Sequence, residues 1–213
     1  MSSLIFHIAE DRVIIATDTL AVTHSDNVRP FNFTTKAHIL PHLKLIVAGT
    51  GAGGFVDSWL VHINTGLRVE DVDNLNEHTP ESLSKRWKEW TKECPIGEPN
   101  SVTVYHFGFS KRTGQIHAYA YRSEKNFYRE LLRQGNHAKP DCKLPTKAPT
   151  PKVIREMMTE QRAIQEAAEG RRVYIGGEIT LHTLTKRGFS VSTIGRFNDY
   201  EKTASTIFEN PKG

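Results

Sequence analysis

The chain has 213 residues, of which 38% are hydrophobic and 24% are charged, and its formal net charge is +4. This length suffices for one domain with a substantial core, and the composition excludes a disordered or fibrous protein. We therefore expect a single domain over residues 1–213. Lys and Arg are spread along the chain, so we expect no nucleic acid partner. No apolar run is long enough to span a membrane and the first thirty residues lack a signal-peptide pattern, so we expect no membrane partner and a cytoplasmic location.

The first eighteen residues predict a β-hairpin. Leu4–Ile8 and Arg12–Ala16 are rich in β-formers and flank the short polar segment Ala9–Asp11. Removal of Met1, which is common before a small residue, would leave a hydroxyl and a free α-amine on Ser2. Such an amine has a pKa of roughly 7.7–8.0 and can act as the base for its own hydroxyl. The alternative is that Met-Ser-Ser is an ordinary chain start.

A glycine-rich turn follows the next strands. The compact β run 43–48 leads into Gly49–Gly54, and Phe55 to Ile63 has helical periodicity. Glycines at this place indicate close backbone approach or positive φ, and N–H groups at a helix start can bind an anion or an oxyanion. A tight packing turn without a ligand explains the pattern equally well. The turn matches neither a P-loop nor a dinucleotide fingerprint, so a phosphate cradle is not supported.

The remaining elements alternate between strands and helices. Thr79-Pro80 predicts a helix start and Thr150-Pro151 a second one, whereas the polar, proline-containing segment 134–150 predicts a surface excursion. The other expected elements are hairpins at 102–109 with 115–121 and at 179–185 with 189–194, and a short helix at 199–209. Strands and helices in this order favour an α+β layered domain over a parallel βαβ sheet.

No pattern indicates a metal or a cofactor, and we expect neither. Cys94 and Cys142 fit no metal-ligand or redox spacing, so they are expected to be thiols, although a disulfide between them is not excluded. His38 and His42 are four residues apart, but Pro41 argues against the helix that would bring their side chains together.

Three stretches together resemble a proteasome-type β-subunit. These subunits belong to the N-terminal-nucleophile (Ntn) hydrolases, which also include HslV-like peptidases. In this family a Thr, Ser or Cys begins the mature chain, and a carboxylate ends the second strand at the offset of Asp18 from Ser2. Lys36 matches the family's lysine, and Gly49–Asp57 reproduces the G-T-x-A-G-G-x-x-D stretch. The C-terminal half agrees more weakly, through the glycine pair and strand at Gly176–Leu181.

The resemblance implies a four-layer αββα sandwich and a set of catalytic roles. Ser2 Oγ would attack an amide carbonyl, with its own α-amine as general base. Lys36, held by Asp18, would lower the pKa of the hydroxyl or the amine, and the N–H of Gly53 would face the developing oxyanion. Asp57 is expected to cap or orient the helix rather than react. Asp18 with Lys36 as a purely structural ion pair remains the alternative.

The resemblance also implies partners: a peptide or amide substrate, a homo-oligomeric ring, and an ATPase that delivers substrate. Three departures from the family pattern bear on activity. After the central strands only Ser123 could replace the family's serine, and Arg172 and Ile175 stand where the family has the Asp and Ser that hold the terminal amine and the catalytic water. Two functions are therefore open: an amidohydrolase with Ser2 as nucleophile, or a catalytically degenerate subunit with a structural or binding role.

Overall fold

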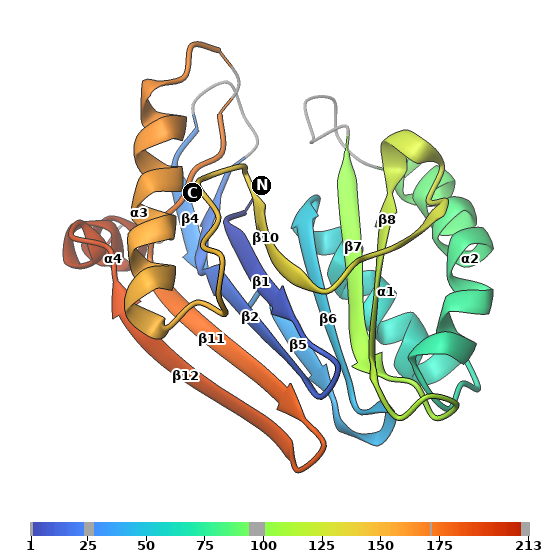
Figure 1. Cartoon of the computed structure of the whole chain (residues 1–213). Helices are drawn as coiled ribbons and strands as arrows, with labels where there is room; N and C mark the ends of the chain where they lie inside the picture. Colours follow the sequence, from blue (N-terminus) through green and yellow to red (C-terminus); the bar gives the residue numbers. More distant parts are fainter. Residues whose placement is uncertain (1, 24–27, 94–100, 171, 210–213) are drawn as a thin grey trace.

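Two five-stranded antiparallel sheets face each other in the computed structural model, which describes residues 2–23, 28–93, 101–170 and 172–209 (Figure 1). The first sheet has the order β10-β1-β2-β11-β12, and the second has the order β5-β6-β7-β8-β9. Every strand pairing in the described residues is antiparallel. The expected α+β class is confirmed.

The first sheet contains the N-terminal hairpin at its centre. Its strands are β1 (Leu4–Ile8), β2 (Arg12–Asp18), β10 (Gly135–Lys139), β11 (Glu178–Thr185) and β12 (Gly188–Arg196). The second sheet is formed by β5 (Ala37–Leu40), β6 (Leu45–Gly51), β7 (Val102–Phe109), β8 (Ile116–Arg122) and β9 (Arg129–Leu131). A separate pair consists of β3 (Leu20–Val22) and β4 (Pro30–Phe33).

Helices lie on the outer faces of both sheets (Figure 1). They are α1 (Gly53–Gly66) and α2 (Val72–Glu93) beside the second sheet, α3 (Pro151–Ala167) beside the first, and α4 (Tyr200–Glu209), which contacts β4. Three apolar clusters hold this arrangement together: one between α1, α2 and the second sheet, one between the two sheets, and one between α3 and the first sheet. Because β7 packs on both faces, all eight of its residues are buried.

The expected helix start at Thr79 is wrong, because α2 begins at Val72 and contains Pro80 in its interior. Asp71 caps this helix instead: its Oδ1 accepts from the N–H of Asn74 at 2.7 Å. The hydroxyl of Thr79 turns back into the helix and donates to the carbonyl of Leu75 at 2.7 Å. A Thr-Pro pair predicts a cap only where no stronger cap precedes it.

The segment 134–150, expected to be a surface excursion, begins with a strand. Its residues Gly135–Lys139 form β10, which pairs with β1 from Ile8 to Leu4. Backbone hydrogen bonds to an edge need no apolar alternation, so the polar sequence gave no strand signal. Residues 141–150 contain no helix or strand.

None of the described helices is long and apolar enough to cross a membrane. Within the described ranges no group of three or more His, Cys, Asp or Glu side chains could hold a metal ion. Cys142 is a free thiol whose pKa burial raises to about 11, and Cys94 lies outside the described residues.

Candidate active site

The N-terminal hairpin brings Asp18 beside the first described residues. Because Leu4 pairs with Thr17, the end of β2 lies next to the residues that precede β1. The N–H of Ser3 donates to Asp18 Oδ1 at 2.9 Å, and Asp18 is fully buried. Ser2 is 8% exposed. The predicted nucleophile and the predicted carboxylate thus lie at the same end of the sheet.

Lys36 completes a buried ion pair with Asp18. Its Nζ donates to Asp18 Oδ1 at 2.8 Å and to the carbonyl of Leu20 at 2.7 Å, and its side chain is only 8% exposed. The other carboxylate oxygen, Oδ2, accepts from the N–H of Gly176 at 3.2 Å. A buried charge needs such partners, since desolvation without them costs several kcal/mol. Asp18 is therefore fixed by contacts from three distant parts of the chain.

The glycines at the end of β6 and the start of α1 fall into two groups. A Cβ on Gly49 would lie 2.3 Å from Val56 Cγ2, and a Cβ on Gly51, whose φ is +99°, would lie 2.2 Å from the carbonyl oxygen of Ser101. These two glycines are required by packing and backbone conformation. A Cβ on Gly53 or Gly54 would meet nothing within 4 Å. Packing thus does not explain the second pair.

Gly53 is the first residue of α1, so its N–H has no carbonyl acceptor within the helix. The residue before it, Ala52, makes no side-chain capping bond. Asp57 does not cap the helix either, because it lies one turn in and its Oδ1 is 3.7 Å from His38 Nε2. The start of α1 therefore offers backbone donors that can stabilise negative charge.

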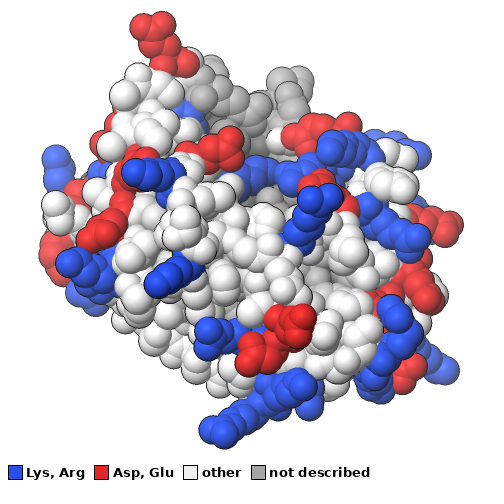
Figure 2. Space-filling model, in the orientation of Figure 1, with Lys and Arg blue, Asp and Glu red and all other residues white. Residues whose placement is uncertain are grey.

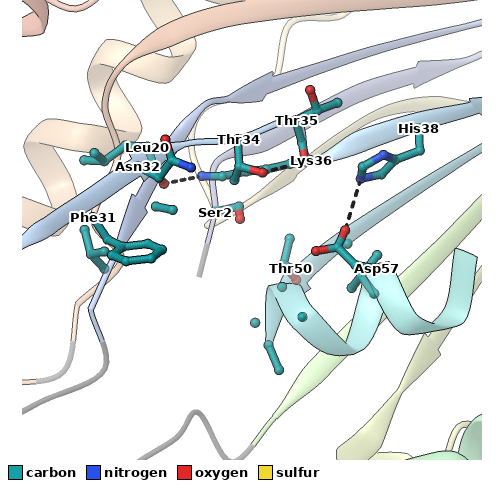
Figure 3. Close-up of a pocket in the computed structure, with 18 of the residues that line it drawn as sticks. Ser2, Leu20, Phe31, Asn32, Thr34, Thr35, Lys36, His38, Thr50 and Asp57 are labelled. Atoms are coloured by element: carbon teal, nitrogen blue, oxygen red, sulfur yellow. Dashed lines mark hydrogen bonds and ion pairs between the residues drawn. The ribbon is translucent and has the colours of Figure 1, made fainter. Parts of the chain in front are cut away.

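A cavity of about 370 Å³ connects these groups. Ser2 and Lys36 line it (Figure 3), as do Gly53 and the rest of the glycine turn. Asp18 does not line the cavity but forms the ion pair with Lys36. Ser2, Lys36 and Gly53 thus line one cavity, and Asp18 holds Lys36 through the ion pair. Trp90 of α2 also lines the cavity.

Two cavity residues were missed by the sequence analysis as site candidates. His38 on β5 faces Asp57 across the cavity (Figure 3), and burial lowers its pKa. Thr50 on β6 is 4% exposed, and its Oγ1 has no hydrogen-bond partner among the described residues. The strand pattern gave no signal for either, because inward-facing positions near a sheet end look like core positions.

The three departures from the family pattern have ordinary structural roles. The hydroxyl of Ser123 accepts from the N–H of Val102 at 3.0 Å, at the start of β7. Arg172 lies over the ring of Tyr174 at 4.9 Å, and Ile175 is buried in the cluster under α3. Ser123 is thus engaged by Val102, and neither Arg172 nor Ile175 has the carboxylate or hydroxyl of the family pattern.

The fold is shared with solved structures of Anbu proteins. Anbu from Hyphomicrobium sp. strain MC1 is 14% identical, with a TM-score of 0.59 over 96% of this chain and 91% of that one. Anbu (ancestral beta-subunit) from Yersinia bercovieri is 12% identical, with a TM-score of 0.60 over 100% of this chain and 94% of that one. No protein-family model and no curated protein sequence matches the chain.

These comparisons correct the resemblance drawn from the sequence. Assignment to the proteasome β-subunit and HslV-like peptidase family is not upheld, since no family model matches and the similar structures are Anbu proteins at 12–14% identity. The short motif stretches cover too little of the chain to define a family. What the likeness shows is a fold in common with Anbu.

Proposed function

We propose that this protein is an Ntn-type amidohydrolase or peptidase with Ser2 as nucleophile after removal of Met1. The observation that carries the proposal is the buried Lys36–Asp18 ion pair beside a cavity that Ser2 lines. A buried ion pair adds little to stability compared with apolar packing, so its presence at a cavity favours a catalytic role. The proposal includes a four-layer αββα sandwich as a single domain over residues 1–213.

In this mechanism the α-amine of Ser2 takes the proton from Ser2 Oγ as the oxygen attacks an amide carbonyl. The positive charge of Lys36 favours the deprotonated hydroxyl or amine, and Asp18 holds Lys36 in place. The N–H of Gly53 donates to the oxyanion of the tetrahedral intermediate, an interaction worth about 3–4 kcal/mol where it has been removed in other hydrolases. The amine then returns its proton to the leaving group. Water hydrolyses the resulting ester on Ser2.

The proposal extends to assembly. The name of one neighbour, ancestral beta-subunit, supports a role as a subunit of an assembly. The proposal includes a homo-oligomeric ring and, from the family resemblance of the sequence alone, an ATPase as a further partner. Several large apolar side chains are exposed in the isolated chain, including Phe31, Tyr128 and Phe208, as expected where subunits meet. Native mass spectrometry would give the number of subunits, and a monomer at micromolar concentration would contradict a ring.

The test of function starts with intact mass and N-terminal sequencing of the protein from its native host. Hydrolysis of fluorogenic peptide amides is then compared for the wild type, Ser2→Ala and Ser2→Thr. We expect a chain that begins at Ser2, loss of activity by about 10³-fold or more in Ser2→Ala, and retained activity in Ser2→Thr. Retention of Met1 in every preparation, or equal activity in Ser2→Ala, would rule out the mechanism.

The second candidate function is a catalytically degenerate subunit, because Arg172 and Ile175 replace the residues that would hold the terminal amine and the catalytic water. Ile175 is 4% exposed and part of an apolar cluster, so it offers no polar group. This observation favours a degenerate subunit with a structural or binding role. A chain that begins at Ser2, assembles into a ring and hydrolyses no amide substrate would support it.

A further inference from the structure

A second polar site lies on one row of residues that crosses the second sheet. Thr50 on β6 pairs with Thr103 on β7, and Thr103 pairs with Arg122 on β8. Residues paired in this way point to the same face, with Cβ atoms about 5 Å apart. Thr103 shares its face with Tyr105, which belongs to the cluster between the sheets, so the whole row faces the first sheet.

Lys139 reaches this row from the opposite sheet. It pairs with Leu4 at the end of β10, and Leu4 also belongs to the cluster between the sheets. Its Nζ donates to Thr103 Oγ1 at 2.8 Å, so the side chain bridges the gap between the two sheets. The ammonium group of Lys139 thus approaches the cross-strand neighbour of Arg122.

In the described residues the cations Lys139 and Arg122 have one ion-paired carboxylate, Glu130, between them. In the described part of the chain no carboxylate forms an ion pair with Lys139. Glu130 contacts Arg122 Nε at 3.1 Å and Lys125 Nζ at 3.8 Å, so it is shared with a third cation. Burial and the charge of Arg122 both lower the pKa of Lys139, and the charge of Glu124 only partly offsets them.

The space beside these groups is large enough for a ligand. Lys139 and Arg122 line a cavity of about 790 Å³ together with Tyr105, His137 and Arg133. Glu130 and Asp141 line it as well, so that three cations stand against two carboxylates, one of which is already engaged. Figure 2 shows Lys and Arg side chains in the hollow at the upper edge of this face.

We propose that Lys139 and Arg122 form an anion-binding site for a carboxylate or phosphate group, in the cleft between the two sheets. The anion would accept hydrogen bonds from the ammonium and the guanidinium and would relieve their mutual repulsion. Thr50, the third member of the row, lines the Ser2 cavity and carries the unpartnered buried hydroxyl. The site therefore adjoins the candidate active site, but it goes beyond the proposed function and does not depend on hydrolysis.

Binding is tested by calorimetric titration of the Ser2→Ala protein with inorganic phosphate at constant ionic strength, so that no hydrolysis can contribute. We expect saturable binding, weakened at least about tenfold by Lys139→Met and by Arg122→Gln, because each removes a charged hydrogen-bond donor. Lys202→Met, which removes the same charge from an exposed position on α4, should leave affinity within about twofold. Lys139→Arg should retain binding, and Lys139→Gln, which also removes the charge, replaces Lys139→Met if that variant does not fold.

A second pair of ligands shows whether the anion is a peptide carboxylate or a phosphate group. A short acetylated peptide with a free carboxylate is compared with the same peptide as its amide. Lys139-dependent binding of the acid alone assigns the site to a peptide carboxylate, and binding of phosphate alone assigns it to a phosphate-bearing ligand. Both results support the proposal. Absence of saturable binding for both anions, or equal affinity in wild type and in Lys139→Met (or in Lys139→Gln where it replaces that variant), would overturn it.

Discussion

Two buried polar pairs in this molecule avoid an unpaired buried charge in opposite ways. At the candidate active site, Asp18 and Lys36 are buried as an ion pair, with backbone groups completing the contacts of both. Under α1, His106 is fully buried against Trp59, whose Nε1–H donates to His106 Nε2 at 2.9 Å. Burial lowers the pKa of His106 to about 3, so the ring is neutral at physiological pH.

The difference shows where the fold retains charge. His106 Nδ1 has no partner in the described residues, and the surroundings of the ring are apolar, so neutrality is the lower-energy state. The Asp18 carboxylate has three contacts, with two backbone donors and one cation, and those contacts come from both ends of the chain. Among the ion pairs of the described residues, this one beside the Ser2 cavity has both side chains buried.

The largest expected effect follows from breaking the charged pair. Asp18→Ala leaves the Lys36 ammonium buried without its counterion and also frees the N–H groups of Ser3 and Gly176. We expect a loss of about 3–5 kcal/mol in the free energy of unfolding, measured by urea denaturation. Lys36→Met should be milder, because Asp18 keeps both backbone donors. Equal losses in the two variants would show that the backbone contacts of Asp18 contribute little.

Gly51→Ala should have the second-largest effect. The left-handed backbone at φ +99° and the approach of the new Cβ to the Ser101 carbonyl together predict a loss of about 2–3 kcal/mol. The matched control is Gly53→Ala, which has open space and should change stability by less than about 1 kcal/mol. If the proposed function is correct, Gly53→Ala keeps the N–H donor but adds a methyl group at the cavity, which crowds the substrate and lowers kcat/KM for peptide amides. A large stability loss in Gly53→Ala would contradict the separation of the two glycine groups.

The buried pair of Trp59 and neutral His106 predicts a pH dependence of stability. The folded pKa of His106 lies below its unfolded value of about 6.5, so the folded state binds fewer protons and stability falls as pH falls below 6.5. The slope is about 1.4 kcal/mol per pH unit, which gives a loss of about 2 kcal/mol between pH 6.5 and 5. Denaturation at several pH values should show a flatter profile for His106→Gln. His78→Gln, at an exposed position, is the control and should keep the wild-type slope.

The smallest effect is expected for the pair His38–Asp57, which also lines the Ser2 cavity. Asp57 is 64% exposed and lies 3.7 Å from His38, so Asp57→Asn should change stability by no more than about 1 kcal/mol. The charge of Asp57 opposes the burial that lowers the pKa of His38, so this variant should lower that pKa further. An NMR titration of the histidine ring measures it, and an unchanged midpoint would show that the two groups do not interact in solution.

The sequence predicted the β-rich architecture well where local patterns act alone. The hairpin of β1 and β2 was expected from its alternation and turn, and α3 from the cap at Thr150, whose side chain accepts from the N–H of Val153. The start of α2 and strand β10 were missed because they depend on Asp71 as a stronger cap and on pairing with a distant strand. Tertiary contacts decide both.

The candidate site was predicted only in part. Ser2, Asp18, Lys36 and Gly53 were selected through the resemblance to proteasome-type subunits, and the structure brings them to one end of the sheets. His38, Thr50 and Lys139 were not selected, since their neighbours come from strands far away in sequence. A single sequence carries no signal for such groupings. Their roles stay predictions until the variants above are measured.

The contact between Gly176 and Asp18 has a consequence for protein synthesis. It joins residues 158 positions apart, and the hydroxyl of Ser3 depends on Gln161 over the same separation. A chain still emerging from the ribosome therefore has Ser2 long before it has Gly176, one of the residues that fix the adjacent carboxylate. If Ser2 is a nucleophile, the contacts of Gln161 and Gly176 beside it form only when translation is nearly complete. This delay protects the nascent chain and its neighbours from premature cleavage.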